Sequence, residues 1–289
     1  MARASHDWPA AAELGERFSD MRPLRSGARF AVVGARDTDA GRNVVIKVPH
    51  ASSGAWLHDA LINEGRILAE LGGHPHVLTC YEQLTLADGR PALVLERCLG
   101  SIYGRLHRVE PMELQNVVAI GIKLAGALET AHRHGILHCD VRPRTVLVSE
   151  WDEPVLAGFD EAVRLAAAAD RPPLHDLTPH TAPELLEGKA PTAASDVYGL
   201  ASTLYELVAG RAAFRTYLGE SPASVIVRVL SNPVLPIVRP SVPLEISDLL
   251  TWSLSAQPSD RPPSPAWVAE ELGRVERRQG WPRTRMIVG

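Results

Sequence analysis

Short apolar runs mark the first part of the chain. Residues 30–33 and 44–48 are rich in Val and Ile, and the polar stretch between them contains Asp39-Ala40-Gly41-Arg42. Runs of this length and composition are typical of strands, and the polar stretch suits a hairpin turn. A second strand pair is predicted over residues 79–85 and 92–95, on either side of Asp88-Gly89. The pattern therefore predicts a small sheet.

Helical spacing of apolar residues appears between the two strand pairs and then dominates the chain. The first predicted helix carries Trp56, Leu57, Leu61, Leu68 and Leu71 and ends at Gly72-Gly73. A long helix is predicted from Pro111 to Gly135, and further helices over residues 196–208, 221–230, 243–253 and 265–277. Residues 165–181 contain an Ala run and are predicted to form a surface loop. Residues 277–289 are basic and unpatterned, which predicts a tail.

Composition places the chain among ordinary soluble globular proteins, because 45% of its residues are hydrophobic and 22% are charged. A formal net charge of -4 gives no general attraction to nucleic acid or to anionic membranes. Only three basic residues, Lys47, Lys123 and Lys189, are Lys, against 27 Arg. Such an Arg bias suggests a GC-rich bacterial source. It also makes Lys47, at the end of an apolar strand, more informative than a Lys usually is.

Cys80, Cys98 and Cys139 are scattered and show no metal-ligand spacing, so they are expected to be free thiols in a reducing cytosol. The first 17 residues lack the apolar centre of a signal peptide, and no run approaches the ~18 apolar residues of a membrane-spanning helix. We therefore expect a cytoplasmic protein with no membrane segment.

Two segments carry most of the functional information. The first reads His138-Cys139-Asp140-Val141-Arg142-Pro143-Arg144-Thr145, and the second reads Val155-Leu156-Ala157-Gly158-Phe159-Asp160. Together they resemble the HRDLKPxN and DFG loops of eukaryotic-type (Hanks-type) bacterial Ser/Thr protein kinases. Three further matches to that family follow in the expected order: Ala182-Pro183-Glu184, Asp196-Val197-Tyr198-Gly199-Leu200 and Asp260-Arg261-Pro262. The resemblance covers residues 22–277.

The resemblance implies an α+β, two-lobed protein kinase fold with a small β-rich N-lobe and a larger helical C-lobe. On this basis residues 1–21 form an N-terminal extension, 22–98 the N-lobe, 99–277 the C-lobe and 278–289 a basic C-terminal tail. It also implies a nucleotide cleft near Glu96-Arg97-Cys98, with ATP as the nucleotide. Lys47 would reach the α- and β-phosphates and would be held by Glu64. The other positions implied to line the nucleotide site are Gly27, Val32, Val45, Glu96, Cys98 and Leu147.

The implied nucleotide site departs from the family pattern. Arg25 and Phe30 replace the outer glycines of G-x-G-x-x-G, so only Gly27 remains to let the backbone approach phosphate. Val45 replaces the Ala that contacts adenine, and two added methyl groups there are expected to weaken nucleotide binding by about 1–3 kcal/mol. Arg25 or Arg29 could instead contact phosphate through the side chain.

The implied catalytic machinery is only partly present. Asp140 would accept the proton of a substrate hydroxyl, and Arg142 replaces the Lys near the transferred phosphate. Thr145 and Gly158 stand where the family has its two magnesium ligands, which makes binding of Mg or Mn doubtful. Asp160, two positions late, is a weak candidate for a relocated ligand. Structural roles are implied for His138, Phe159, Glu184, Asp196 and Arg261.

Regulation and substrate docking also depart from the family. Cys139 replaces the Arg that in many members reads a phosphorylated activation loop, and only Thr178 and Thr181 offer hydroxyls there. The Tyr expected before Ala182-Pro183-Glu184 is missing. Activation by loop phosphorylation is therefore not expected.

Three hypotheses follow. The chain could be a pseudokinase that binds ATP weakly or not at all and acts as a regulatory or scaffold protein. It could be an atypical active Ser/Thr kinase with Asp140 as base and Asp160 as metal ligand. It could also be a nucleotide-free interaction module whose cleft is filled by Val45 and Phe30. Each implies a protein partner or substrate and no nucleic acid.

Overall fold

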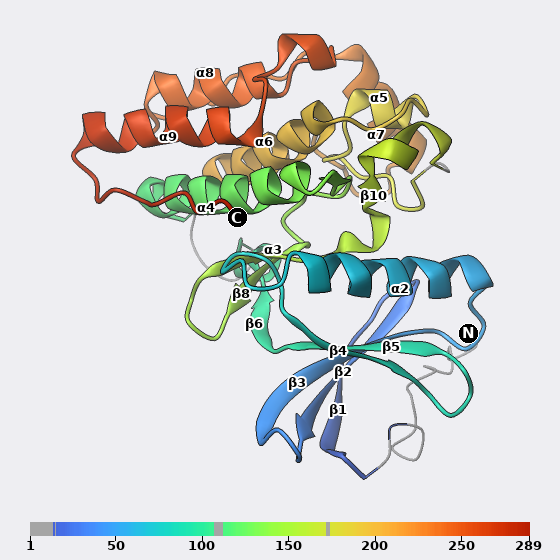
Figure 1. Cartoon of the computed structure of the whole chain (residues 1–289). Helices are drawn as coiled ribbons and strands as arrows, with labels where there is room; N and C mark the ends of the chain where they lie inside the picture. The colour runs from blue at the N-terminus through green and yellow to red at the C-terminus, as the bar shows by residue number, and fades with distance from the viewer. Residues whose placement is uncertain (1–13, 15, 107–111, 172–173) are drawn as a thin grey trace. The chain divides into compact units, whose positions relative to one another are not determined.

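The computed structural model describes residues 14, 16–106, 112–171 and 174–289. Its contacts divide the chain into two units (Figure 1). Unit 1 comprises the described residues up to Gly73 together with Val77–Leu99, and unit 2 comprises His74–His76 together with Gly100–Gly289. The short strand β6 (Cys98–Ser101) carries the chain from unit 1 into unit 2.

Unit 1 contains an antiparallel five-stranded sheet and the helix α2 (Ala55–Glu70). The strand order is β1-β2-β3-β5-β4. The strands are β1 (Phe18–Ser26), β2 (Phe30–Asp37), β3 (Arg42–Pro49), β4 (Cys80–Thr85) and β5 (Pro91–Glu96). Both predicted strand pairs and the predicted helix are confirmed. Turn residues Gly41 and Gly89 have φ of 65° and 88°, a conformation that glycine adopts without strain.

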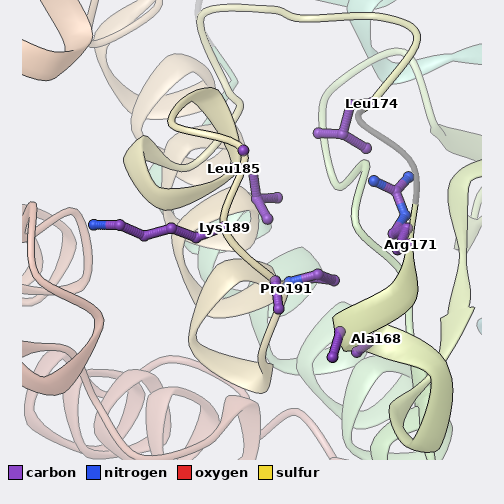
Figure 2. A pocket seen from close by; sticks show the side chains of 9 residues that line it. Ala168, Arg171, Leu174, Leu185, Lys189 and Pro191 are labelled. Atoms are coloured by element: carbon purple, nitrogen blue, oxygen red, sulfur yellow. The ribbon is translucent and has the colours of Figure 1, made fainter.

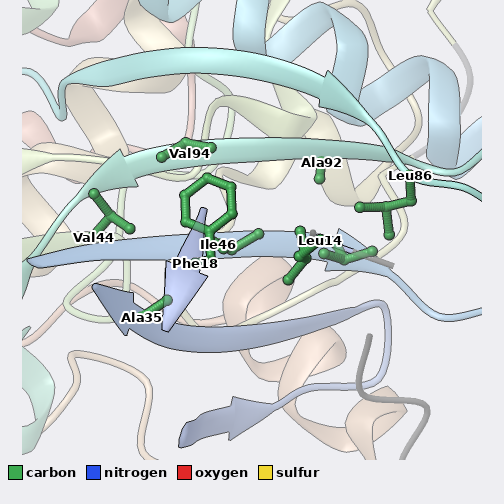
Figure 3. Close-up of a cluster of buried hydrophobic side chains, with 9 residues drawn as sticks. Leu14, Phe18, Ala35, Val44, Ile46, Leu86, Ala92 and Val94 are labelled. Atoms are coloured by element: carbon green, nitrogen blue, oxygen red, sulfur yellow. The ribbon is translucent and has the colours of Figure 1, made fainter. Parts of the chain in front are cut away.

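The sheet of unit 1 buries side chains on both faces. On the face away from α2, alternate residues of β3 and β5 are fully buried with residues from the start of the chain (Figure 3). That cluster consists of Leu14, Phe18, Ala35, Val44, Ile46, Val48, Leu86, Ala92 and Val94. Leu14 and Phe18 lie in the segment predicted as an N-terminal extension. Strand β1 begins at Phe18, four residues before the predicted lobe.

Unit 2 is mainly helical. Its helices are α3 (Ile102–Leu106), α4 (Leu114–Arg133), α5 (Pro183–Leu186), α6 (Ala193–Ala209), α7 (Pro222–Ser231), α8 (Leu244–Ser253) and α9 (Pro265–Gln279). The predicted helices from residue 196 onward are confirmed. The predicted start of the long helix at Pro111 lies outside the described residues, and α4 begins at Leu114. Gly210 and Gly280, with φ of 71° and 68°, end α6 and α9.

The centre of unit 2 is formed by α4, α6 and α9, which contact one another pairwise (Figure 1). Gly121 of α4 allows the close approach, because a Cβ there would lie 2.7 Å from Leu272 of α9 and 2.9 Å from Leu204 of α6. The 20-residue α4 therefore serves as the packing platform for the other two helices.

Short strands and 3₁₀ turns carry the sequence motifs of unit 2. The strands are β7 (Ile136–Leu137), β8 (Val146–Ser149), β9 (Pro154–Leu156) and β10 (Val163–Arg164), and the 3₁₀ turns are η1 (Phe159–Glu161), η2 (Leu165–Asp170) and η3 (Pro258–Asp260). The Ala run was predicted as part of a surface loop. Residues 165–170 do lie at the surface except for Ala168, but they form the 3₁₀ turn η2, which places Ala168 in a buried cluster with Leu137 and Cys139.

Candidate active site

Lys47 and Glu64 form an ion pair inside unit 1. The Lys47 Nζ atom of β3 lies 2.6 Å from Glu64 Oε2 of α2, and the Glu64 side chain is only 1% exposed. Helix α2 packs closely against the sheet at Gly65, the residue after Glu64. A Cβ at Gly65 would lie 2.7 Å from both Leu93 Cδ2 and Gln83 Oε1. The absence of a side chain at Gly65 thus brings Glu64 to Lys47.

Phe30 covers the Lys47 ammonium group. Its ring centroid lies 4.2 Å from Lys47 Nζ, and Phe30 is 8% exposed. In the β2–β3 register Lys47 faces Val32, so Phe30 is its diagonal neighbour on the same face. A cation held over a ring face and paired with a carboxylate is stabilised where it stands. The Phe30 ring therefore lies between the Lys47 ammonium group and the β1–β2 turn.

The β1–β2 turn is fastened by its own hydrogen bonds. The Gly27 N–H donates to the Phe30 carbonyl (3.0 Å), and the Gly27 carbonyl lies 2.8 Å from the His50 Nε2 atom. The His50 N–H donates to the Arg29 carbonyl (3.3 Å). In the family the glycine-rich loop offers backbone N–H groups to phosphate. Here the N–H of the single remaining glycine is already used.

The other residues predicted to line the nucleotide site lie on strands of both units. Val45 opposes Leu95 across β3 and β5 and is half-buried. Glu96 accepts the Thr79 N–H at 3.2 Å, and the Cys98 thiol donates to its other oxygen at 3.8 Å. In unit 2, Leu147 of β8 pairs with Val155 of β9.

In unit 2, a carboxylate of α6 shapes the loop that carries Asp140. Asp196 accepts the N–H groups of His138 and Cys139 at 2.8 Å each, and its Oδ2 atom also lies 2.8 Å from His132 Nε2. The two N–H groups converge because Cys139 adopts a φ of 66°, which is rare for a residue other than glycine. Gly199 lets α6 approach this loop, since a Cβ there would lie 2.8 Å from the Val141 carbonyl oxygen.

His138 joins this loop to the segment that follows β9. Its Nε2 atom lies 3.0 Å from the Ala157 carbonyl, and its Nδ1 atom accepts the Asp140 N–H at 3.2 Å. Burial lowers the pKa of His138, so the ring is neutral with the proton on Nε2. The ring also contacts Phe159, with centroids 4.5 Å apart. His138 and Phe159 are thus brought together.

Arg142 lies between two carboxylates. Its Nε atom is 3.0 Å from Asp140 Oδ1, and its Nη2 atom donates to Asp176 Oδ2 at 2.8 Å. Burial raises the pKa of Asp140 to about 8, although Arg142 opposes the shift; the carboxylates of Asp160 and Asp176 add to it. A carboxyl group with a raised pKa keeps its proton to higher pH than an exposed Asp does. Asp176 was not singled out from the sequence, because it belongs to no motif.

Thr145 uses its hydroxyl to close the same loop. Its Oγ1 atom lies 2.8 Å from the Asp140 carbonyl and 3.0 Å from the Arg142 carbonyl, and it accepts the Arg142 N–H at 3.1 Å. Thr145 is 8% exposed. A hydroxyl engaged in this way fixes the backbone around Asp140.

The Thr145 side chain occupies the space in which a side chain at position 158 would lie. Gly158 has a φ of 80°, and a Cβ built on it would lie 2.6 Å from Thr145 Cγ2 and 3.2 Å from Thr145 Cβ. The two positions that the kinase resemblance assigns to magnesium ligands are therefore adjacent, and the Thr145 side chain occupies the space beside Gly158. Asp160 lies in η1, directly after Phe159. Within the described parts of the chain, no group of three or more His, Cys, Asp or Glu is arranged to hold a metal ion.

The described residues between Asp160 and Ala182 correspond to the activation segment of the kinase resemblance, and we use that name for them. They are held by apolar and ionic contacts. Cys139 is 7% exposed and clusters with Leu137 and Ala168, and burial raises the pKa of its thiol well above the ordinary value. Arg171 donates to Glu161 Oε2 at 2.7 Å. A small hollow beside this cluster is lined by residues of η2 and of the stretch after α5 (Figure 2). Cys139 therefore anchors η2 through buried contacts, at the position where the family resemblance implied an Arg.

Glu184 and Arg261 form a buried two-point ion pair, with N–O distances of 2.7 and 2.8 Å. Arg261 also donates to the carbonyls of Ala194, Ser255 and Ala256. Its side chain is fully buried. The pair joins α5 to the segment between α8 and α9, and Arg261 also contacts the first turn of α6.

Comparison with known proteins agrees with this arrangement. Residues 18–272 match the protein kinase domain. The chain belongs to the protein kinase family. It is 34% identical over 273 residues to the serine/threonine-protein kinase PknK of Mycobacterium tuberculosis, a match that covers 93% of this chain and 24% of that protein. It is 30% identical over 264 residues to PkaB of Streptomyces coelicolor, covering 87% of this chain and 61% of PkaB.

The kinase resemblance is thus confirmed, and so is the α+β kinase fold. The chain spans about a quarter of the length of the PknK proteins that it matches. No helix in the described residues is long and apolar enough to cross a membrane.

Proposed function

We propose that this kinase domain is a pseudokinase that acts as a regulatory or scaffold module. The observation that carries the proposal is the contact between Gly158 and Thr145. The family as a whole uses ATP with a divalent metal ion. The residues here do not fit that ion, because neither position offers a carboxylate or amide oxygen and the Thr145 methyl group fills the space. Hard cations such as Mg²⁺ need oxygen ligands of that kind.

The phosphate-binding side supports the same proposal. Lys47 is paired with Glu64 and covered by Phe30, and the Gly27 N–H is bonded within its own turn. A nucleotide that used Lys47 would have to displace the Phe30 ring. We therefore expect ATP to bind weakly or not at all, and the fixed activation segment to present a constant surface to a protein partner.

An atypical active kinase is the second candidate. It is favoured by the intact Asp140 and by Asp160, whose charge acts on Asp140. In that case Asp160 would supply a metal ligand from η1, and Lys47 and Arg142 would bind phosphates. The names of the relatives describe Ser/Thr kinases and are consistent with either candidate.

Thermal shift assays separate the candidates. The purified chain is tested with ATP alone, with ATP and Mg²⁺ and with ATP and Mn²⁺, beside Lys47→Ala as a control that removes the phosphate contact. The pseudokinase proposal expects no shift, or a shift that metal does not enlarge. A metal-dependent shift that disappears in Lys47→Ala contradicts it, as does phosphate transfer that disappears in Asp140→Asn. If the Asp160→Ala variant shows the same metal-dependent shift as the parent chain, Asp160 is not a metal ligand.

A further inference from the structure

The last nine residues of the chain, Trp281–Gly289, form an extended segment that lies along α4 (Figure 1). We refer to them as the C-terminal segment. They contain no helix or strand, yet their backbone is fixed by hydrogen bonds to α4, α9 and the turn that follows α2. The sequence predicted only an unpatterned tail here.

The far end of the C-terminal segment fits a groove on α4. Gly126 forms the floor, since a Cβ at this position would overlap the carbonyl oxygen of Ile287. The Thr130 hydroxyl donates to the Gly126 carbonyl at 2.8 Å and accepts the Gly289 N–H at 3.1 Å. The groove thus depends on one residue without a side chain and on one hydroxyl.

The same end also binds the turn after α2. The His74 Nε2 atom lies 3.0 Å from the Ile287 carbonyl, while its Nδ1 atom accepts the His76 N–H at 3.1 Å. His76 in turn contacts the Pro154 carbonyl at 2.9 Å. The C-terminal segment therefore stabilises a chain of contacts that reaches the β8–β9 hairpin.

The near end is held to α9 by Thr284 and by the Trp281 N–H, which donates to the Glu276 carbonyl at 2.9 Å. Of these two residues, only Thr284 contacts the Glu276 side chain. Its hydroxyl donates to Glu276 Oε1 at 2.6 Å, and its N–H donates to Glu276 Oε2 at 2.9 Å. Glu276 lies on α9 and is 2% exposed, so its carboxylate depends on these two donors. A buried carboxylate that loses a donor and meets a new negative charge is strongly disfavoured.

We propose that Thr284 is a phosphorylation site and that its modification releases the C-terminal segment from α4. A separate Ser/Thr protein kinase would supply the phosphoryl group from ATP. A bond forms between Thr284 Oγ1 and the γ-phosphorus, the bond from that phosphorus to ADP breaks, and the hydroxyl proton passes to the base of that kinase. The proposal is independent of whether this chain itself binds ATP.

The buried carboxylate of Glu276 favours release. Phosphorylation removes the donor to Glu276 and adds nearly two negative charges next to it. Arg274 and Arg277 line a second cavity, which Thr284 also lines. Both arginines are exposed, and Arg274 already pairs with Glu271. Exposed charges are screened by solvent and salt, whereas the buried Glu276 is not. Arg283 and Arg285, the chain neighbours of Thr284, are exposed as well. None of these four arginines replaces the hydroxyl donor that the buried Glu276 carboxylate loses on phosphorylation, so the contact with α9 is broken.

The proposal is tested by hydrogen exchange of the C-terminal segment in the 289-residue chain. Thr284→Glu, and the same chain carrying phosphothreonine at 284 by peptide ligation, should both exchange at least about tenfold faster over residues 281–289. Thr284→Val removes the hydroxyl without adding charge and should have a smaller effect. Thr284→Ser should match the unmodified protein.

A second substitution tests whether repulsion from Glu276 causes the faster exchange. Glu276→Gln removes the buried charge and keeps an acceptor for the Thr284 N–H, so Thr284→Glu in that background should exchange close to the unmodified rate. Equal opening by Thr284→Glu and Thr284→Val, or failure of Glu276→Gln to restore slow exchange, would overturn the proposal. A phosphorylated chain that keeps slow exchange would overturn it as well.

Discussion

Single side chains decide what the catalytic loop of this protein can do. The Thr145 hydroxyl closes the loop around Asp140, and its methyl group occupies the space beside Gly158. The sequence identified both positions as altered, because each belongs to a fixed motif. It could not show that the two alterations are in contact, since they are thirteen residues apart.

The contact between Thr145 and Gly158 predicts non-additive stability. Gly158→Ala should lower the free energy of unfolding by about 1–3 kcal/mol, because its φ is positive and the new methyl group overlaps Thr145. Thr145→Ser keeps the hydroxyl and removes the methyl group, so Gly158→Ala should be milder by about 1 kcal/mol in that background. Urea unfolding of the four proteins measures both values. Equal losses in the two backgrounds would show that the methyl contact is absent.

Asp140 predicts a pH effect on stability. Its pKa rises from the ordinary value of 3.8 to about 8 on folding, so the folded protein holds a proton that the unfolded chain has lost. The stabilising contribution is complete below pH 4 and is lost as the pH rises toward 8. Asp140→Asn removes this dependence, so the free energy of unfolding of the variant relative to the parent should increase from pH 5 to pH 8. A constant difference across that range would contradict the raised pKa.

Elements at the start of the chain were the hardest to predict. Strand β1 contains Pro23 and charged residues, and two irregularities interrupt its register with β2, so no period-two pattern marks it. The strands β2 to β5 and α2 were predicted because their apolar residues are regularly spaced. Arg17, just before β1, bonds to Asp37 at the end of β2 and to Glu82 of β4, and no sequence pattern indicated this.

Arg17→Ala should lower the free energy of unfolding by about 1–3 kcal/mol, less than a fully buried pair because Arg17 is 31% exposed. Asp37 has no exposed side-chain surface, and the Arg17 hydrogen bond lowers its pKa to about 2. Its contribution is present above pH 3.8 and is lost as the pH falls through about 2. Chemical unfolding at pH 7 and pH 2.5 measures the loss, which should be smaller at the lower pH. Arg22→Ala, an exposed residue of β1, serves as the control and should change little.

For the molecule as a whole, the sequence motifs identified the residues of the candidate site. They did not predict most of the contacts that those residues make. The two-part α+β order and the kinase resemblance came from the sequence. The Glu184–Arg261 pair, 77 residues apart, was expected only from the resemblance. The roles of Asp176, His50 and the C-terminal segment depend on side chains that meet only in the folded protein, and no local pattern encodes them.

Arg261→Ala should destabilise unit 2 by about 3–5 kcal/mol, since it leaves Glu184 buried without its partner. A loss of this size lowers Tm by roughly 10 °C in a protein of this length. Arg278→Ala, which breaks an exposed pair with Glu245, is the matched control and should lower Tm by no more than about 2 °C. Calorimetry of the two variants measures both Tm values. A similarly small decrease in Tm for both variants would contradict the structural role of Arg261.

The closed space at Gly158 also sets the order in which evolution could restore a metal ligand. An Asp introduced first at position 158 meets the Thr145 methyl group and a left-handed backbone, so that intermediate is destabilised before it gains any ligand. A change at position 145 must come first, and by itself it supplies no carboxylate at 158. Thr145 thus blocks a change at position 158, and descendants of this chain are expected to keep Gly158 for as long as they keep Thr145.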